Sequence, residues 1–243
     1  MKTLIKNGLI VNEGKSFIGS ILIEDELISD IFSQNDTLPD SDLVIDATSK
    51  VVFPGIIDDQ VHFREPGASH KATIESESKA AILGGVTSFM DMPNNNPPAT
   101  TISDIEKKFD IAQRDSYANY SFYLGATNSN LDEILSVDPT KVCGVKLFMG
   151  SSTGNMLVNN EETLNSIFSK SKILLATHCE DEETIKENLQ IAKDRYGEDI
   201  PFSEHSKIRS AQACIKSTQK ALSFATKYNS TLHILHISTK EEC

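Results

Sequence analysis

The feature of this sequence that most constrains its fold is a regular alternation, after Pro54, of short apolar segments with longer amphipathic ones. The short segments favour strands over residues 56–63, 86–92, 120–124, 145–149, 173–177 and 232–237. Helix-like stretches lie between most of them, over residues 73–83, 103–114, 160–169, 181–196 and 207–228. Strands that are apolar along nearly their whole length and alternate with helices predict a parallel sheet covered by helices.

An incomplete (β/α)8 TIM-type barrel explains this α/β pattern better than an open doubly wound sheet does. A doubly wound sheet would carry a Gly-rich phosphate-binding turn after an early strand, and the sequence has none. A closed eight-stranded barrel takes roughly 250 residues, which is more than this 243-residue chain offers after Pro54. We therefore expect about six barrel strands, in a chain that is truncated after the sixth.

Residues 1–53 follow a different rhythm, in which short apolar pieces alternate with Gly, Asn, Asp and Glu. Such a run of short strands and turns predicts a small β-sheet unit. The segment Val-Val-Phe-Pro-Gly at 51–55 marks the boundary between this unit and the barrel.

The composition excludes several classes of protein. A formal net charge of −12, with no basic stripe to offset it, would repel nucleic acid, so an anionic ligand would need arginine or lysine placed locally. No apolar run approaches the ~18 residues of a membrane span. Lys6, Asn7 and Gly8 interrupt the N-terminal apolar stretch, so we expect no secretory signal and a cytoplasmic protein. The 4 cysteines are scattered and predict no disulfide framework.

Candidate metal-ligating residues fall where a barrel enzyme would need them. Catalytic groups of a β/α barrel sit at the carboxyl ends of its strands. The residues at or near those ends here are His62, Lys146, His178 and His236. Each alone has an ordinary interpretation as a capped or buried polar residue, but their coincidence at one end of one barrel favours a metal site.

Side-chain alternation sorts the first barrel strand into two faces. The residues expected to face the barrel interior are Asp58, Gln60, His62 and Arg64. Those expected to face outward are Asp59, Val61 and Phe63. An imidazole and a guanidinium on the inner face would place a metal ligand beside an anion-binding residue.

The other histidines have plainer interpretations. His233 and His236 are three residues apart on one strand, so they should point to opposite faces. We expect His236, nearer the carboxyl end, to line the barrel and His233 to pack beneath a helix. His70 and His205 fall in loops and are expected to be solvated or structural.

Lys146 poses a separate problem, because an ammonium cannot ligate a cation and is costly to bury in an apolar barrel. Both difficulties disappear if its pKa is lowered and the amine captures carbon dioxide as a carbamate, which is a long carboxylate able to bridge two metals. A salt-bridged structural lysine is the alternative, and the residues alone leave both open.

Several segments, read as strings, resemble the dihydroorotases of the amidohydrolase superfamily. They are PGIID at 54–58, VHFREPG at 61–67, GGVT at 84–87, DMPN at 91–94, GVKLFMG at 144–150, THCE at 177–180 and LHIST at 235–239. The match covers essentially the whole chain in the right order, and the FREPG and MPN pieces are its most specific parts.

The resemblance implies a set of roles. The zinc ligands, for one or two ions, would be His62, Lys146 (as carboxylysine), His178 and His236. Arg64 and Asn94 would hold the substrate carboxylate, and Asp58 would support the site from behind. The implied reaction is the reversible hydrolysis of the cyclic amide of (S)-dihydroorotate to N-carbamoyl-L-aspartate in de novo pyrimidine biosynthesis, with the metals polarising the amide carbonyl.

The same resemblance implies a domain plan and a set of partners. Residues 1–53 would form an N-terminal β-sandwich segment, completed by later chain, and residues 54–243 a metal-dependent amidohydrolase barrel truncated after the sixth strand. The expected partner is a small-molecule substrate, with neither nucleic acid nor membrane, and a homodimer is left open.

Two departures from the family pattern matter. The first strand of the family offers His-x-His, whereas this sequence has Gln60 at the first position, and a neutral amide oxygen is a weaker zinc ligand than imidazole. The general base of the family is an aspartate at the end of the eighth strand, expected beyond residue 243. We therefore expect the 243-residue chain by itself to be inactive.

Other readings compete with dihydroorotase. Allantoinase and dihydropyrimidinase share the barrel and much of the metal set, but a substrate without a carboxylate would give Arg64 no partner. A non-catalytic paralogue that assembles with another pyrimidine enzyme would explain Gln60, although it would have no reason to keep the four candidate ligands. A sugar-phosphate barrel enzyme would need a Gly-rich phosphate loop, which the sequence lacks.

Overall fold

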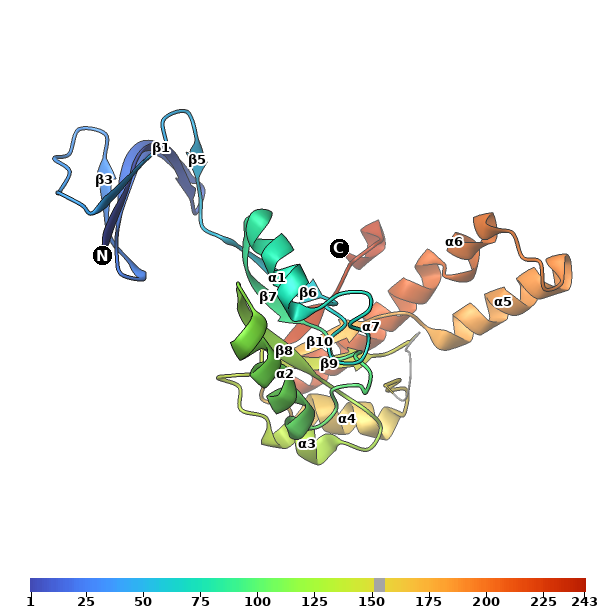
Figure 1. Cartoon of the computed structure of the whole chain (residues 1–243). Helices are drawn as coiled ribbons and strands as arrows, with labels where there is room; N and C mark the ends of the chain where they lie inside the picture. The colour runs from blue at the N-terminus through green and yellow to red at the C-terminus, as the bar shows by residue number, and fades with distance from the viewer. Residues whose placement is uncertain (151–155) are drawn as a thin grey trace. The chain divides into compact units, whose positions relative to one another are not determined.

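The computed structural model describes residues 1–150 and 156–243, which fold as two compact units, Met1–Ile56 and Ile57–Cys243 (Figure 1). None of the helices in these residues combines the length and the hydrophobicity needed to cross a membrane. Each unit is described by itself below.

The first unit is a mixed β-sheet. Its strands are β1 (Lys2–Asn12), β2 (Lys15–Glu24), β3 (Leu27–Ser33), β4 (Leu43–Asp46) and β5 (Val51–Val52). Their order is β3-β2-β1-β4, with β5 also paired to β1. The strand β2 is antiparallel to both β1 and β3, whereas β4 and β5 run parallel to β1. Leu4, Ile10 and Leu22 are buried, while apolar residues of β3 and β4 such as Ile28 and Val44 are exposed. The predicted small β unit is confirmed.

The second unit contains the predicted incomplete barrel. In the part of the chain that the structure describes, its strands are β6 (Ile56–Val61), β7 (Val86–Asp91), β8 (Asn119–Gly125), β9 (Gly144–Phe148), β10 (Leu175–His178) and β11 (Leu232–Ile234). They lie side by side in chain order and run parallel from β7 to β11. Sequential parallel strands joined by helices are the arrangement of a β/α barrel. The expectation of about six strands in one sheet is therefore confirmed.

The helices begin at side-chain caps that the sequence supplies. They are α1 (Ile74–Leu83), α2 (Ile102–Asp115), α3 (Leu131–Ser136), α4 (Glu161–Lys170), α5 (Glu182–Tyr196), α6 (His205–Ile208) and α7 (Ala211–Tyr228), with 3-10 turns η1 (Phe202–Glu204) and η2 (Lys240–Glu242). Thr73, Thr101, Asn160, Asp181 and Ser210 each accept a hydrogen bond from a backbone N–H of the first turn.

One helix boundary was predicted wrongly. The sequence pattern extends a single helix over 207–228, but the structure ends α6 at Ile208 and begins α7 at Ala211. The Ser210 side chain accepts from the backbone N–H of Ala213, so a serine that could lie inside a helix instead starts a new one. The short α3 was not predicted, because its 6 residues are too few to display a helical period.

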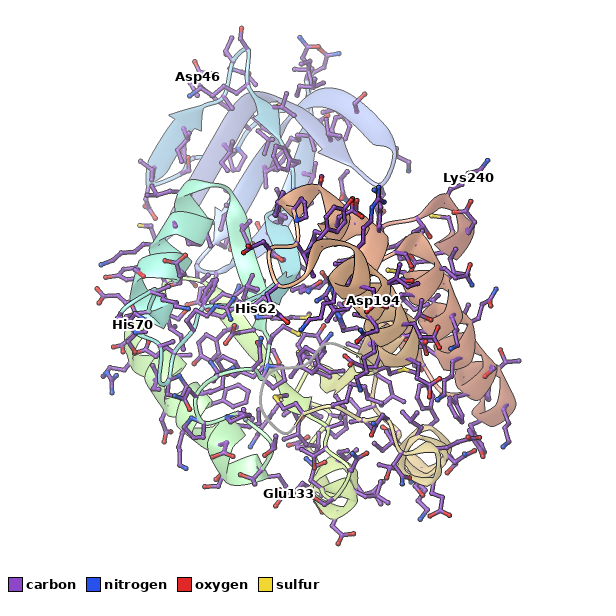
Figure 2. All side chains as sticks on the ribbon, turned by 90° about the vertical axis from the view of Figure 1, so that its right-hand side faces the viewer. Asp46, His62, His70, Glu133, Asp194 and Lys240 are labelled. Carbon is purple, nitrogen blue, oxygen red and sulfur yellow. The ribbon has the colours of Figure 1, made fainter. Side chains whose placement is uncertain are left out.

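Two apolar clusters define the two faces of the parallel sheet. The larger cluster lies between the sheet and its helices and includes Phe122, Val145 and Leu175. The smaller one, on the inner face, contains Met92, Tyr123, Ala176 and Leu235. The side chains of the second unit fill these layers (Figure 2). Inner and outer residues alternate along β8 to β10, as expected for strands covered on both faces.

The structure corrects the expectation for His233. Residue partners in a parallel pair point to the same face, and the pairing sets Lys146, Ala176 and His233 in one row across β9, β10 and β11. Because Ala176 belongs to the inner cluster, His233 faces the barrel interior and does not pack beneath a helix. Its Nε2 lies 3.2 Å from Oδ2 of Asp59 on β6.

The same contact corrects the expectation for Asp59. Phe63 and Val61 lie in or against the outer cluster, as predicted. The Asp59 carboxylate does not share their apolar surroundings but reaches His233, on the strand at the opposite edge of the sheet. Strict side-chain alternation fails at Asp59. The residue lies on β6, an edge strand, and its carboxylate pairs with His233 on β11.

Candidate functional site

Three of the four candidate metal ligands lie at or just beyond the carboxyl ends of barrel strands, and the fourth lies in the middle of a strand. His62 follows β6 directly, Lys146 lies within β9, His178 is the last residue of β10, and His236 comes two residues after β11. This placement agrees with the rule that barrel enzymes build their sites at that end. His62 is labelled in Figure 2.

His178 and His236 are in direct contact. Nδ1 of His178 lies 3.0 Å from Nε2 of His236, and the rings meet edge to face with centroids 4.8 Å apart. His236, two residues after β11, has φ 38, a left-handed conformation that breaks the side-chain alternation. Burial, and secondarily the neighbouring His178, lower the pKa of His236, which keeps its imidazole neutral and able to act as a ligand.

His178 is oriented by a carboxylate that the sequence reasoning did not single out. Its Nε2 lies 2.7 Å from Oε2 of Glu180, and Arg209 forms a two-pronged ion pair with the same carboxylate. Burial alone would raise the pKa of Glu180, but the hydrogen bonds from His178 and Arg209 outweigh it and lower the pKa to about 2. Glu180 therefore accepts a hydrogen bond from the Nε2–H of His178, and Nδ1 presents its lone pair toward His236.

Lys146 is an isolated cation in the core. Its side chain is 1% exposed, and its Nζ has no hydrogen-bond partner among the described residues. The nearest feature is the Phe148 ring, with the Nζ 4.6 Å from the ring centroid. Burial lowers the pKa of Lys146 to about 7, so a large fraction of the amine is neutral near neutral pH. The salt-bridged alternative finds no support in this environment.

His62 is joined to the candidate substrate-binding residue Asn94. Its Nδ1 lies 2.7 Å from Oδ1 of Asn94. An amide oxygen only accepts, so Nδ1 donates and Nε2 keeps the lone pair that a metal would need. Burial is the main reason that the pKa of His62 is lowered. Gln60 donates its backbone N–H to Asp58 Oδ1 at 3.1 Å, so Asp58 contacts its own strand and none of the four candidate ligands among the described contacts.

The arrangement fits a metal in part. In the residues that the structure describes, no cluster of three or more His, Cys, Asp or Glu side chains is poised to hold an ion. Nδ1 of His178 and Nε2 of His236 nevertheless lie 3.0 Å apart. The unpartnered amine of Lys146 belongs to a residue on the inner face of the same sheet. A carbamate on Lys146 would add the carboxylate oxygens that this set lacks.

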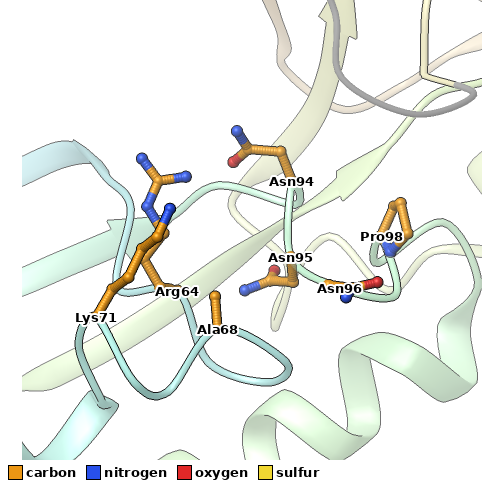
Figure 3. A pocket seen from close by; sticks show the side chains of 7 residues that line it. All are labelled: Arg64, Ala68, Lys71, Asn94, Asn95, Asn96 and Pro98. Carbon is orange, nitrogen blue, oxygen red and sulfur yellow. The ribbon is translucent and has the colours of Figure 1, made fainter.

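A pocket beside His62 gathers the polar groups expected to bind an anion. It encloses about 330 Å³ and is lined by Arg64, Ala68, Lys71, Asn94, Asn95, Asn96 and Pro98. Figure 3 shows the cationic ends of Arg64 and Lys71 above the loop, with the Asn94 amide across from them. Neither cation has an ion pair in the described part of the chain. Lys71 was missed from the sequence because it lies in an irregular loop.

Gly67 lets the two walls of this pocket approach each other. It has φ +94, and a Cβ at this position would lie 1.7 Å from the backbone oxygen of Asn96. Only glycine combines that conformation with so close an approach. The glycine of the FREPG segment is thus explained by the contact between the loop after β6 and the loop after β7.

Replacing Gly67 with alanine is expected to separate these loops. We predict a loss of about 2 kcal/mol or more in the free energy of unfolding, because a strained φ adds to a backbone clash. Gly85→Ala is the matched control, since Gly85 has φ +87 but nothing within 4 Å of its Cβ position. Chemical denaturation measures both; equal losses would show that the contact with Asn96 is unimportant.

The chain was compared with known proteins. The family model described as dihydro-orotase-like matches residues 49–242. The dihydroorotase of Thermococcus kodakarensis is 33% identical over 241 residues, which are 98% of this chain and 52% of that protein. The allantoinase of Desulfitobacterium hafniense is 33% identical over 207 residues, 82% of this chain and 45% of its own length. The chain spans about half the length of the curated relatives it matches.

Solved structures agree on the fold. The L-hydantoinase (dihydropyrimidinase) from Arthrobacter aurescens superposes with a TM-score of 0.92 at 24% identity, over 99% of this chain and 54% of that one. The D-hydantoinase from Thermus sp. gives 0.78 at 26% identity, over 99% and 53%. The match to the family model over most of the sequence, together with the dihydroorotase relatives, places the chain in the dihydro-orotase-like family.

Proposed function

We propose that this chain carries the metal and carboxylate-binding sites of a dihydroorotase, which interconverts (S)-dihydroorotate and N-carbamoyl-L-aspartate in pyrimidine biosynthesis. The observation that carries the proposal is the pocket lined by Arg64, Lys71 and Asn94, whose two cations have no ion-pair partner among the described residues. A ligand that enters beside His62 and bears a carboxylate would complete it.

The proposed metal ligands are His62, Lys146, His178 and His236, and zinc is the metal that this imidazole and carboxylate donor set favours. A zinc ion held there would polarise the scissile amide carbonyl. Lys146 contributes by attack of its neutral nitrogen on carbon dioxide, which forms the N–C bond of a carbamate and releases one proton. Glu180 and Arg209 fix the ring of His178 so that its Nδ1 faces the site.

Arg64 and Asn94 are proposed to hold the substrate carboxylate. Because Asn94 Oδ1 accepts from His62, its Nδ2 remains to donate toward the pocket. Lys71 adds a second positive charge to the same pocket. Together these donors would orient the ring so that its cyclic amide faces the histidines, and they disfavour a neutral ureide as the substrate.

The remaining parts of the proposal concern the whole protein. Residues 54–243 are proposed to form the metal-dependent amidohydrolase barrel, and residues 1–53 part of a β-sandwich. The protein is proposed to act in the cytoplasm on a small-molecule substrate.

The direct test is turnover by the full-length protein that contains this chain. Purified protein loaded with zinc is incubated with dihydroorotate, allantoin or hydantoin, and the ring-opened products are quantified by chromatography. We expect turnover of dihydroorotate that a chelator abolishes and added zinc restores. Preference for allantoin or hydantoin would overturn the substrate assignment. Zinc-loaded protein with no turnover of any of the three would favour the non-catalytic paralogue.

Gln60 is expected to weaken one of two metal positions. Lys146 as a carbamate, His178 and His236 would give one zinc three protein ligands, the number typical of a catalytic site. A second zinc would have His62, a carbamate oxygen and only a neutral amide at Gln60. We predict that elemental analysis after dialysis gives about one zinc per chain or fewer, and that Gln60→His raises the occupancy. Two tightly held zinc ions in the unmutated chain would contradict this prediction.

A further inference from the structure

A buried lysine outside the proposed metal set donates a hydrogen bond to Asn95, one of the residues that line the anion pocket. Lys108 is on α2, and its side chain is 0% exposed. Burying an ammonium is costly unless it is paired and hydrogen-bonded. A fully buried lysine on a helix that covers the barrel therefore requires partners, and those partners come from the last residue of β7 and the loop that follows it.

Three oxygen atoms surround the Lys108 Nζ. Oδ2 of Asp91 lies 2.7 Å away in an ion pair, the backbone oxygen of Met92 accepts at 3.0 Å, and Oδ1 of Asn95 accepts at 2.8 Å. Two of these contacts are hydrogen bonds and the third is an ion pair, so the buried ammonium has both polar and charged partners. The Nζ also lies 4.7 Å from the centroid of the Phe122 ring. Lys108 thus binds the chain on both sides of Asn94.

The same partners reach across to the loop that carries Arg64. The other oxygen of Asp91, Oδ1, accepts from the backbone N–H of Phe63 at 2.9 Å. The Asn95 side chain donates through Nδ2 to the backbone oxygen of Glu65 at 2.8 Å. Phe63 and Glu65 are the two chain neighbours of Arg64. One buried cation is therefore connected, through one intermediate side chain on each path, to both sides of Arg64.

Arg64 needs such support from its neighbours. Its backbone has φ 67, a left-handed conformation that is strained for a residue with a Cβ. The described contacts give its side chain no ion pair that would hold it in place. Its position in the pocket is set by the backbone on either side, which the contacts of Asp91 and Asn95 fix.

We propose that Lys108 is a positioning residue that holds the Arg64 and Asn94 loops at the spacing needed to bind a carboxylate between them. The inference rests on the proposed function, because it concerns the geometry of the proposed carboxylate site. It assigns Lys108 no contact with substrate or metal. The substrate affinity of the pocket would then depend on Lys108, a residue of α2 that does not line the pocket.

The test compares three variants of the full-length protein. Lys108→Met removes the cation and keeps most of the apolar chain. Asn95→Ala removes the connection from Lys108 to Glu65 but leaves the Lys108–Asp91 ion pair intact. This variant replaces Lys108→Met in the test if Lys108→Met does not fold because Asp91 has lost its buried partner. Lys107→Met is the matched control, because Lys107 precedes Lys108 on α2 but is 64% exposed and pairs with Asp104 at the surface.

The expected kinetic result separates positioning from general stability. Asn95→Ala and Lys108→Met should each raise KM for dihydroorotate tenfold or more, with kcat within threefold and zinc content unchanged. In an Arg64→Ala background the further increase in KM should be less than twofold, since the group being positioned is gone. Lys107→Met should match the wild type. Increases in KM that persist undiminished in the Arg64→Ala background would overturn the proposal.

A second readout does not depend on turnover. Hydrogen exchange of the Phe63 amide, followed by NMR, should accelerate tenfold or more in Lys108→Met, or in Asp91→Asn if Lys108→Met does not fold, and stay unchanged in Lys107→Met. Unchanged exchange in the Lys108 or Asp91 variant overturns the positioning role alone. Failure of the wild-type protein to turn over dihydroorotate, with the predicted exchange pattern present, overturns the proposed function and with it the carboxylate assignment, but leaves the connection between the loops established.

Discussion

Replacing Arg64 with alanine in the full-length protein is expected to lower kcat/KM for dihydroorotate by about two orders of magnitude or more, chiefly by raising KM. Arg64 lines the candidate anion pocket and has no competing ion pair among the described residues, so its guanidinium is available to the substrate. A charge-assisted, largely desolvated contact to a carboxylate contributes on the order of 3 kcal/mol, which corresponds to that loss. Steady-state kinetics measures it.

The control for this prediction is Arg114→Ala. Arg114 is 70% exposed and pairs with its chain neighbour Asp115, so its removal should leave the kinetics unchanged. Arg64→Lys should recover only part of the loss, because an ammonium keeps the charge but cannot bind a carboxylate through two parallel hydrogen bonds. A change of less than threefold for Arg64→Ala would mean that the substrate carboxylate is held elsewhere.

The second large effect is expected for Lys146→Ala, which should reduce tightly bound zinc and kcat/KM by about two orders of magnitude or more. The buried amine has no hydrogen-bond partner in the described residues, and its pKa of about 7 leaves much of it neutral and nucleophilic. The substitution removes the atom on which the proposed carbamate forms. Elemental analysis and kinetics after zinc loading measure the two losses.

A chemical rescue distinguishes a lost carboxylate from a damaged core. The alanine variant leaves space where the lysine side chain was, and acetate or propionate can place a carboxylate there, so millimolar additions should restore part of the zinc and the activity. Lys141→Ala, which changes an exposed lysine just before β9, is the control. Full zinc binding by Lys146→Ala without any added acid would show that Lys146 is not a ligand precursor.

Much of the fold follows from local pattern. The segment at 145–149 is apolar apart from Lys146, which is enough to predict a buried parallel strand. Because a barrel brings the carboxyl ends of its strands together, the sequence predicts that His62, Lys146, His178 and His236 form one group. In the structure, two of them, His178 and His236, are in contact. Alternation also assigned Phe63 and Val61 correctly to the outer core.

The parts that sequence reasoning missed depend on contacts between distant residues or on local departures from regular geometry. Arg209 pairs with Glu180 across 29 residues, and nothing near Arg209 in the sequence indicates that partner. His236 escapes strand alternation through its left-handed backbone, which places it against His178. A lysine in an amphipathic helix is usually solvated, so Lys108 gave no sign that it is fully buried.

The central claim is that this pocket selects a cyclic amide that carries a carboxylate. The most direct measurement is the ratio of kcat/KM for dihydroorotate to that for 5,6-dihydrouracil, which has the same ring without the carboxylate, in the zinc-loaded full-length protein. We expect a ratio of about 100 or more, set by the contacts of Arg64 and Asn94, and a fall toward one in Arg64→Ala. A wild-type ratio near one, or a preference for dihydrouracil, would contradict it.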